Sequence, residues 1–164
     1  MSTVPALRVR AMRPEDVDVV AEIFHLGWHD GHDGHVSAEL ARARTAASFR
    51  DRAAARVAQT LLMLRGSEVA GFVVVNDDEL EQVYVAAAHR GRDVAPRLLL
   101  EGLRVVGEHG HERAWLAVAP GNARARRCYE KQGWVEGVLL DYQAEGPDGP
   151  ISTPCLRYER AVAA

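Results

Sequence analysis

The hydrophobic positions along the chain alternate between the two-residue period of strands and the three- to four-residue spacing of helices. Near the start, alternation over residues 6–12 predicts a strand. An apolar stripe over 17–28 then predicts a helix, and Pro14 just before it suits a first helical turn. The segment 28–35 is polar and contains two glycines, so we expect a loop there.

The rest of the chain continues in the same way. Ser37 is placed to cap a second helix that reaches about Val57. Asn122 is placed to cap a helix that ends near Gly133, and a Gly/Pro-rich loop is expected over 145–154. The remaining patterns predict strands over 60–65, 69–75, 80–85, 113–119, 134–142 and 156–162, and a helix over 94–107.

These elements make an α/β protein, expected as one domain over residues 1–164. We predict a central mixed, mostly antiparallel sheet of about six to seven strands, flanked by about four helices. Neither a repeat nor a change of composition marks a second domain.

Composition narrows the function classes. The 164 residues are 48% hydrophobic, which is ordinary for a globular protein, and the net charge of −3 favours neither nucleic acid nor an anionic membrane. The longest apolar runs fall short of the 18 residues that a membrane helix needs. Cys128 and Cys155 are too few for a disulfide framework, and two free thiols suit a cytoplasmic protein.

A strand–loop–helix junction over 80–100 is the first chemical signal. Arg90, Gly91 and Arg92 form the loop, and the helix that follows would present free N–H groups and its positive dipole end. Such a junction suits a phosphate group, although a plain structural loop has the same pattern.

A second signal lies in the segment 122–134. Asn122, Ala125 and Tyr129 fall at i, i+3 and i+7 and therefore share one helix face. Gly133 would end this helix just before Trp134 opens a strand.

Taken together, the two segments resemble the motifs of the GNAT N-acetyltransferase superfamily. The first is similar to its acetyl-CoA motif, Arg/Gln-x-x-Gly-x-Gly/Ala, and the second to Asn-x-x-Ala-x-x-x-Tyr-Glu-x-x-Gly-aromatic. The resemblance covers nearly the whole chain and implies a GNAT-like fold. It also implies transfer of an acetyl group from acetyl-CoA, the acyl-donor cosubstrate, to a primary amine of a small molecule, peptide or protein. In that family the amine attacks the thioester directly.

The resemblance also implies which residues hold the cosubstrate. Val83, Tyr84 and Val85 would line the pantetheine arm, with a strand N–H acting as oxyanion donor. Asn122 and Ala125 would contact the same arm from the helix. The pyrophosphate would lie on the loop residues Arg90, Gly91, Arg92, Asp93, Val94 and Ala95.

Tyr129 is the implied general acid, because a phenol can protonate the departing thiolate. The alternative is a half-buried core aromatic. Cys128 is a rival nucleophile, but it is turned about 100° around the helix from Tyr129.

Glu81 is the first expected base for the amine, acting directly or through water, although a solvent-facing glutamate would show the same pattern. His29, His32 and His35 are alternative bases, and with Trp28 they are expected to help choose the acceptor. The spacing of these histidines also permits a metal-binding loop. The chain offers no second ligand cluster, so no metal is expected.

Asp93 departs from the family pattern, which has Gly at this position. As a helix N-cap, Asp93 would stabilise the helix by about 1 kcal/mol, but its carboxylate would repel the pyrophosphate. An alternative function follows from this departure, namely a non-catalytic or regulatory acyl-CoA binder. A homodimer formed through an exposed strand edge is also possible.

Overall fold

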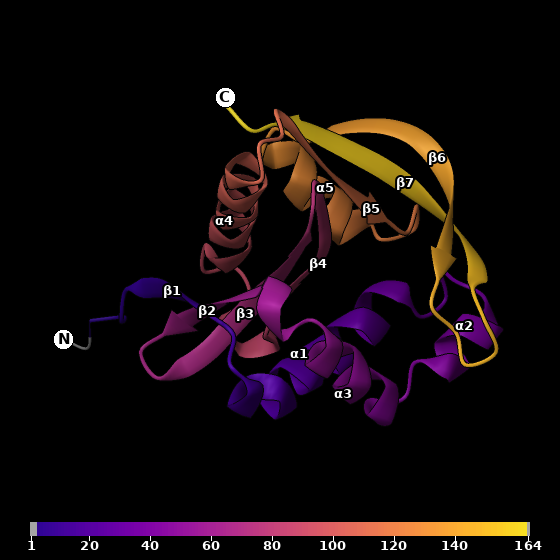
Figure 1. The fold of residues 1–164 in the computed structure, drawn as a ribbon, viewed down its shortest axis with the longest axis horizontal. Coiled ribbons are helices and arrows are strands. Elements are labelled where there is room, and N and C mark those ends of the chain that lie inside the picture. The colour runs from indigo at the N-terminus through magenta and orange to yellow at the C-terminus, as the bar shows by residue number, and fades with distance from the viewer. Residues whose placement is uncertain (1–2, 164) are drawn as a thin grey trace.

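The computed structural model describes residues 3–163, and at its centre is a seven-stranded sheet with the order β1-β2-β3-β4-β5-β7-β6 (Figure 1). Neighbouring strands are antiparallel except β4 and β5, which are parallel. The strands are β1 Leu7–Ala11, β2 Thr60–Arg65, β3 Glu68–Asn76, β4 Glu79–Val85, β5 Arg113–Val118, β6 Val135–Ala144 and β7 Ile151–Ala161. The helices are α1 Val17–His32, α2 Ala38–Ala43, α3 Ala46–Ala55, α4 Val94–Glu108 and α5 Ala123–Lys131. The mixed, mostly antiparallel sheet predicted from the sequence is confirmed.

Helices cover both faces of this sheet. On one face, α1 and α3 pack over β3 through an aromatic cluster of Phe24, Phe49 and Phe72. On the other face, α4 buries Leu98 and Leu99 in a second apolar cluster. Figure 1 shows α1 and α3 below β3 and α4 above it. Two separate hydrophobic cores therefore hold β4 between them.

The predicted loop over 28–35 is wrong for its first half, because α1 continues to His32. Gly27 and Gly31 are helix residues that allow close packing, whereas Gly34 lies beyond the end of the helix with φ 82°. A Cβ on Gly27 would lie 2.6 Å from Cδ1 of Tyr84, and a Cβ on Gly31 would lie 2.7 Å from Nδ2 of Asn122. These glycines bring α1 against the site rather than ending the helix.

The single helix predicted over 37–57 is also wrong, because it is divided into α2 and α3. Ser37 caps α2 as expected, and its side chain accepts from the N–H of Leu40. Thr45 then caps α3 by accepting from the N–H of Ser48. A threonine with an extended backbone offers the chain this alternative to a continuous helix.

The Gly/Pro-rich loop is shorter than predicted, because β7 begins at Ile151. Ile151 and Thr153 are buried, and they pair with Ala144 and Tyr142 of β6. Because these residues are paired, the long β6–β7 ribbon reaches toward α2, as Figure 1 shows.

The two central strands separate soon after they meet. The pairing of β4 with β5 is recorded at Glu79 and Trp115 alone. In addition, Val74 of β3 is opposite Gln82 while Val75 is opposite Leu80, so Glu81 is an extra, bulged residue in β4. The backbone of β4 beyond the bulge is therefore left without a partner strand on the β5 side.

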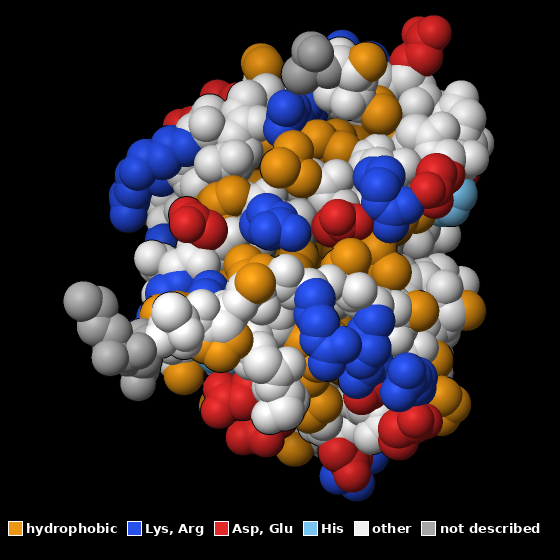
Figure 2. Space-filling model, turned by 90° about the vertical axis from the view of Figure 1, so that its left-hand side faces the viewer, with side chains coloured by type: hydrophobic (Ala, Val, Ile, Leu, Met, Phe, Trp, Pro, Cys, Tyr) orange, Lys and Arg blue, Asp and Glu red, His pale blue; other side chains and the backbone are white. Residues whose placement is uncertain are grey.

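Among residues 3–163, no helix has the length and apolarity needed to cross a membrane. Figure 2 shows the face on the side of β1 and α4, where basic and acidic side chains lie interspersed with apolar ones.

Candidate active site

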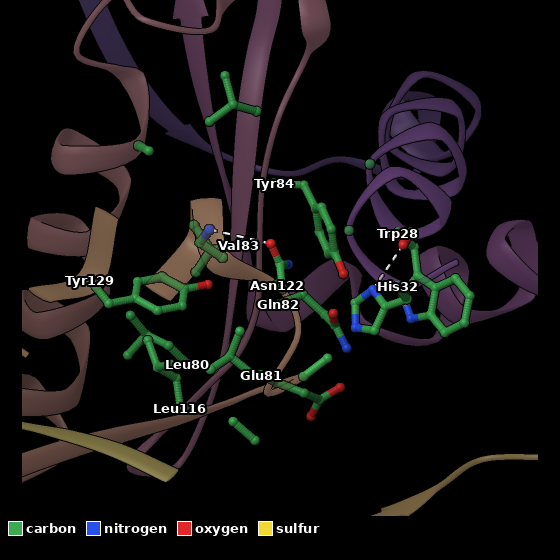
Figure 3. Close-up of a pocket in the computed structure, with 18 of the residues that line it drawn as sticks. Trp28, His32, Leu80, Glu81, Gln82, Val83, Tyr84, Leu116, Asn122 and Tyr129 are labelled. Atoms are coloured by element: carbon green, nitrogen blue, oxygen red, sulfur yellow. Dashed lines mark hydrogen bonds between the residues drawn. The ribbon is translucent and has the colours of Figure 1, made fainter. Parts of the chain in front are cut away.

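A cavity of about 670 Å³ lies where β4 and β5 diverge. Its walls come from α1, α3, β4, the start of α4, α5 and the β6–β7 ribbon. In Figure 3, Tyr129 lies on one side of β4 and the Trp28–His32 pair lies on the other, with Tyr84 and Asn122 between them. Strand β4 thus divides the cavity into two halves, here called the α4–α5 half and the α1–α3 half.

Most of the residues predicted from the sequence meet in this cavity. They are Trp28, His32, Glu81, Val83, Tyr84, Val85, Arg90, Gly91, Asp93, Val94, Ala95, Asn122, Ala125 and Tyr129. Three predicted residues are not among those that line it. His29 lies between the Asp33 carboxylate and the Arg44 carbonyl, and His35 and Arg92 are exposed.

The loop before α4 has an unusual backbone. Gly91 has φ 73° and open space around it, and Asp93 has φ 66°. The expectation that Asp93 caps α4 with its side chain is wrong: Asp93 occupies the cap position but makes no side-chain hydrogen bond there. Side-chain capping normally needs an extended backbone, which the left-handed conformation of Asp93 does not supply. The first N–H groups of α4 are therefore not satisfied by this carboxylate.

An ion-pair bridge connects α1 to this loop and to α5. Oδ2 of Asp30 lies 3.0 Å from Arg90 and 2.6 Å from Arg124. The hydrogen bond from Arg124 lowers the pKa of Asp30 below its usual value. At neutral pH, two of the basic groups at this end of the cavity therefore share one negative charge.

Helix α5 begins as predicted, because Asn122 accepts a hydrogen bond from the N–H of Ala125 at 3.3 Å. One helical face then carries Tyr129 into the cavity, as Figure 3 shows. Burial raises the pKa of the Tyr129 phenol, which therefore remains protonated at neutral pH. Burial also raises the pKa of the Cys128 thiol, and both cysteines are free.

In the α1–α3 half, the bulged Glu81 is held from two sides. Its Oε1 accepts from Nε of Arg56 at 3.0 Å, and its Oε2 accepts from Asn76 at 3.3 Å. Both oxygens are therefore engaged before any ligand arrives.

Glu79 is a residue that the sequence prediction missed. Its Oε1 accepts from the Tyr142 hydroxyl at 2.9 Å, and burial raises its pKa to about 7. The two-residue spacing of Glu79 and Glu81 along the strand could have indicated that both carboxylates lie on the same side. Tyr142 lies 63 residues away, however, so no local pattern connects it to Glu79.

The aromatic wall of this half is formed by Trp28 and His32. Their rings are stacked at 4.4 Å with planes 5° apart, and Nδ1 of His32 lies 2.8 Å from the Trp28 carbonyl. Burial lowers the pKa of His32 to about 4, so its imidazole is neutral at physiological pH. Within residues 3–163, no three His, Cys, Asp or Glu side chains gather as metal ligands would.

Comparison with known proteins now identifies the family. The acetyltransferase (GNAT) family matches residues 20–134, so the chain belongs to that family. A mycothiol acetyltransferase of Corynebacterium glutamicum is 32% identical over 113 residues, covering 66% of this chain and 37% of the relative. One of Corynebacterium efficiens is 35% identical over 119 residues, covering 70% of this chain and 38% of the relative. The chain thus spans little more than a third of the curated relatives that it matches.

Solved structures share the fold over almost the whole chain. A GCN5-related N-acetyltransferase from Rhodopseudomonas palustris is 24% identical with a TM-score of 0.71, and 96% of each chain is covered. The PaiA N-acetyltransferase of Thermoplasma acidophilum, solved in complex with coenzyme A, is 17% identical with a TM-score of 0.71, covering 94% of this chain and 99% of the other. Both likenesses extend over the sheet and the helices on its two faces.

Proposed function

We propose that this protein is an acetyl-CoA-dependent N-acetyltransferase that moves an acetyl group to a primary amine. The observation that carries the proposal is the divergence of β4 from β5. It leaves the N–H and C=O groups of Val83 and Val85 without a partner strand, inside the cavity. An extended amide chain such as pantetheine is suited to that edge, because it can bond as a missing strand would.

The α4–α5 half fits the rest of the cosubstrate. The open Gly91 and the start of α4 offer N–H groups to the pyrophosphate, with Arg90, Asp93, Val94 and Ala95 around them. Asn122 and Ala125, at the start of α5, also line the cavity. Arg92 is exposed and would act through its backbone rather than its side chain.

The α1–α3 half would receive the amine. The amine must lose a proton, and a base is most effective when its pKa lies near the working pH. Glu79 meets that requirement, with its pKa near 7. We therefore propose that Glu79 accepts the proton of the amine. Glu81, the base expected from the sequence, is less suited to this role because its oxygens are engaged by Arg56 and Asn76.

Tyr129 would supply the proton for the departing thiolate, since its raised pKa keeps the phenol protonated. The same burial keeps Cys128 a neutral thiol, which is a poor nucleophile. Direct attack by the amine is therefore favoured over an acetyl-cysteine route.

A calorimetric titration with acetyl-CoA tests the binding half of this proposal. We expect a micromolar Kd that is lost or much weakened in Asn122→Ala. Thiol release with a panel of primary amines tests the catalytic half. Binding without thiol release for any amine would favour the alternative, a regulatory acyl-CoA binder, whereas no binding up to millimolar concentration would contradict both.

The proposal includes a homodimer formed through the edge strand β6. Val135, Val138 and Leu139 expose more than 60% of their surface on this strand. An exposed apolar edge favours pairing with a second copy. Sedimentation of the wild type should show a dimer that Leu139→Asp converts to monomer. The cytoplasmic location stays a prediction from the sequence.

A further inference from the structure

Two arginines, one buried and one half-buried, lie in the α1–α3 half of the cavity without an ion-pair partner among residues 3–163. Arg44, from the α2–α3 junction, is only 5% exposed. Arg52 of α3 is half-buried, lines the same cavity, and lies near enough to Arg44 for its charge to lower the pKa of Arg44. Nε of Arg44 and Nη1 of Arg52 are shielded from solvent and have no hydrogen-bond partner among residues 3–163. Buried guanidinium groups are normally paired, because an unpaired charge is costly to bury.

The surroundings do not provide the missing partner. Arg44 donates from Nη1 to the Glu145 carbonyl at 2.5 Å, which is a neutral acceptor. The Arg44 guanidinium carbon lies 5.8 Å from the centre of the Trp28 ring, and that of Arg52 lies 4.8 Å from the centre of the Phe24 ring. Aromatic faces position a guanidinium but do not neutralise it.

Burial lowers the pKa of both groups, to about 10 for Arg44. Both therefore stay charged at neutral pH. The nearby His32 is neutral and adds no charge of its own. The carboxylates that line the cavity form no ion pair with either arginine. Glu81 is paired with Arg56, Glu79 is hydrogen-bonded to Tyr142, and Glu145 is exposed.

We propose that the amine acceptor carries a carboxylate, which Arg52 and Arg44 bind while the amine faces β4. This inference rests on the proposed acetyltransferase function and names the class of its acceptor, an amino acid or other amino carboxylate. The planar guanidinium forks match a carboxylate, and the bond is made inside a shielded cavity. Glu79 and Glu81 lie on the strand side of the same half, where they attract the amine rather than the carboxylate.

The test compares amines that differ only in this charge. Thiol release is measured with α- and ω-amino acids and with the corresponding amino amides. We expect kcat/KM to be roughly ten- to a hundredfold higher for the acids, the range of a charge-assisted hydrogen bond. The amine of an α-amino amide is the weaker base, so any bias from amine ionisation acts against this expectation.

Arg52 is then replaced while the fold is monitored. Arg52→Gln should bring the acid-to-amide ratio close to one, and Arg52→Lys should retain part of it. Arg50→Gln is the matched control, because Arg50 lies on the same helix but is exposed, 3.3 Å from Asp18. Far-UV circular dichroism that matches the wild type shows that Arg52→Gln is folded.

Equal rates for acids and amides, or a ratio that survives Arg52→Gln, would overturn the proposal. If no amine at all releases thiol, the acetyltransferase function fails, and anion binding is then tested alone. Succinate and inorganic phosphate should raise the Tm of the wild type and of Arg50→Gln, but not that of Arg52→Gln. Absence of any Arg52-dependent shift would overturn the carboxylate site independently of catalysis, and a shift with phosphate alone would exclude a carboxylate as its ligand.

Discussion

The two halves of the cavity are built in different ways. The α4–α5 half consists mainly of backbone groups and of charges that are already paired, as in the bridge from Asp30 to Arg90 and Arg124. The α1–α3 half consists of side chains, and its Arg44 and Arg52 each keep a buried nitrogen atom without a hydrogen-bond partner among residues 3–163. Backbone groups can hold a cosubstrate common to a family, whereas side chains can adapt one member to its own acceptor. We therefore expect the side chains of the α1–α3 half to determine which amine is accepted.

The largest expected effect is on the protonation step in the α4–α5 half. Tyr129→Phe removes the proposed acid, so kcat should fall by about 10²–10³-fold. The Kd of acetyl-CoA should stay within twofold, since the phenol is expected to act on the thiolate and not in ground-state binding. Stopped-flow thiol release and calorimetry check the two values. A kcat within threefold of the wild type would remove Tyr129 from the mechanism.

The next effect concerns the base in the α1–α3 half. Because Glu79 has its pKa near 7 and acts when ionised, kcat should rise with pH up to about 7 and then level off. Glu79→Gln should lower the plateau by about 10²-fold and remove this inflection. The ionisation of the amine contributes equally to both proteins, so their difference isolates the carboxylate.

Two further variants test whether Glu79 is the base. Glu81→Gln should keep an inflection but move it to lower pH, because the negative charge of Glu81 helps to raise the pKa of Glu79. Complete loss of the inflection in Glu81→Gln would instead assign the proton to Glu81. Tyr142→Phe removes a hydrogen bond that favours the ionised carboxylate, so the inflection should move to higher pH.

A smaller effect should follow from releasing the paired charges. Asp30→Ala frees Arg90 and Arg124 for the phosphates and removes a negative charge beside them. We expect acetyl-CoA to bind several-fold tighter at low salt, with a smaller gain at high salt. Asp33→Ala is the control, because Asp33 contacts His29 outside the cavity lining. Weaker binding in Asp30→Ala would mean that the bridge positions the arginines rather than competing for them.

The smallest effect is expected at Asp93. Asp93 has φ 66°, a conformation that glycine adopts freely, and glycine lacks the carboxylate. Asp93→Gly should therefore tighten acetyl-CoA binding by a few fold. Asp77→Gly is the matched control, since Asp77 has φ 57° in the β3–β4 turn away from the cavity lining. Calorimetry compares the two variants. An unchanged or higher Kd in Asp93→Gly would show that the Asp93 carboxylate does not oppose the phosphates.

The sequence predicted well what depends on neighbours along the chain. The caps Ser37 and Asn122, the strand β4 and the face that carries Tyr129 follow from local spacing, and all lie where they were expected. Glycines that serve packing cannot be told from glycines that end helices, so the continuation of α1 through Gly31 was missed.

The α1–α3 half was predicted less completely because its contacts join distant segments. Tyr142 meets Glu79 across 63 residues, and Arg44 meets the Glu145 carbonyl across 101. Burial, which raises the pKa of Glu79 and keeps His32 neutral, is likewise a property of the folded chain. The bulge that isolates Glu81 depends on the register of β3 against β4, which no single-strand pattern sets.

The central claim is that the amine and the acetyl-CoA occupy the two halves at once and react directly across β4. Initial rates measured while both substrates are varied test it most directly. We expect intersecting double-reciprocal lines, which are typical of a ternary complex, and no acetylated protein by mass spectrometry. Parallel lines together with an acetylated Cys128 would contradict it, because they would mean that the acetyl group passes through the protein before it reaches the amine.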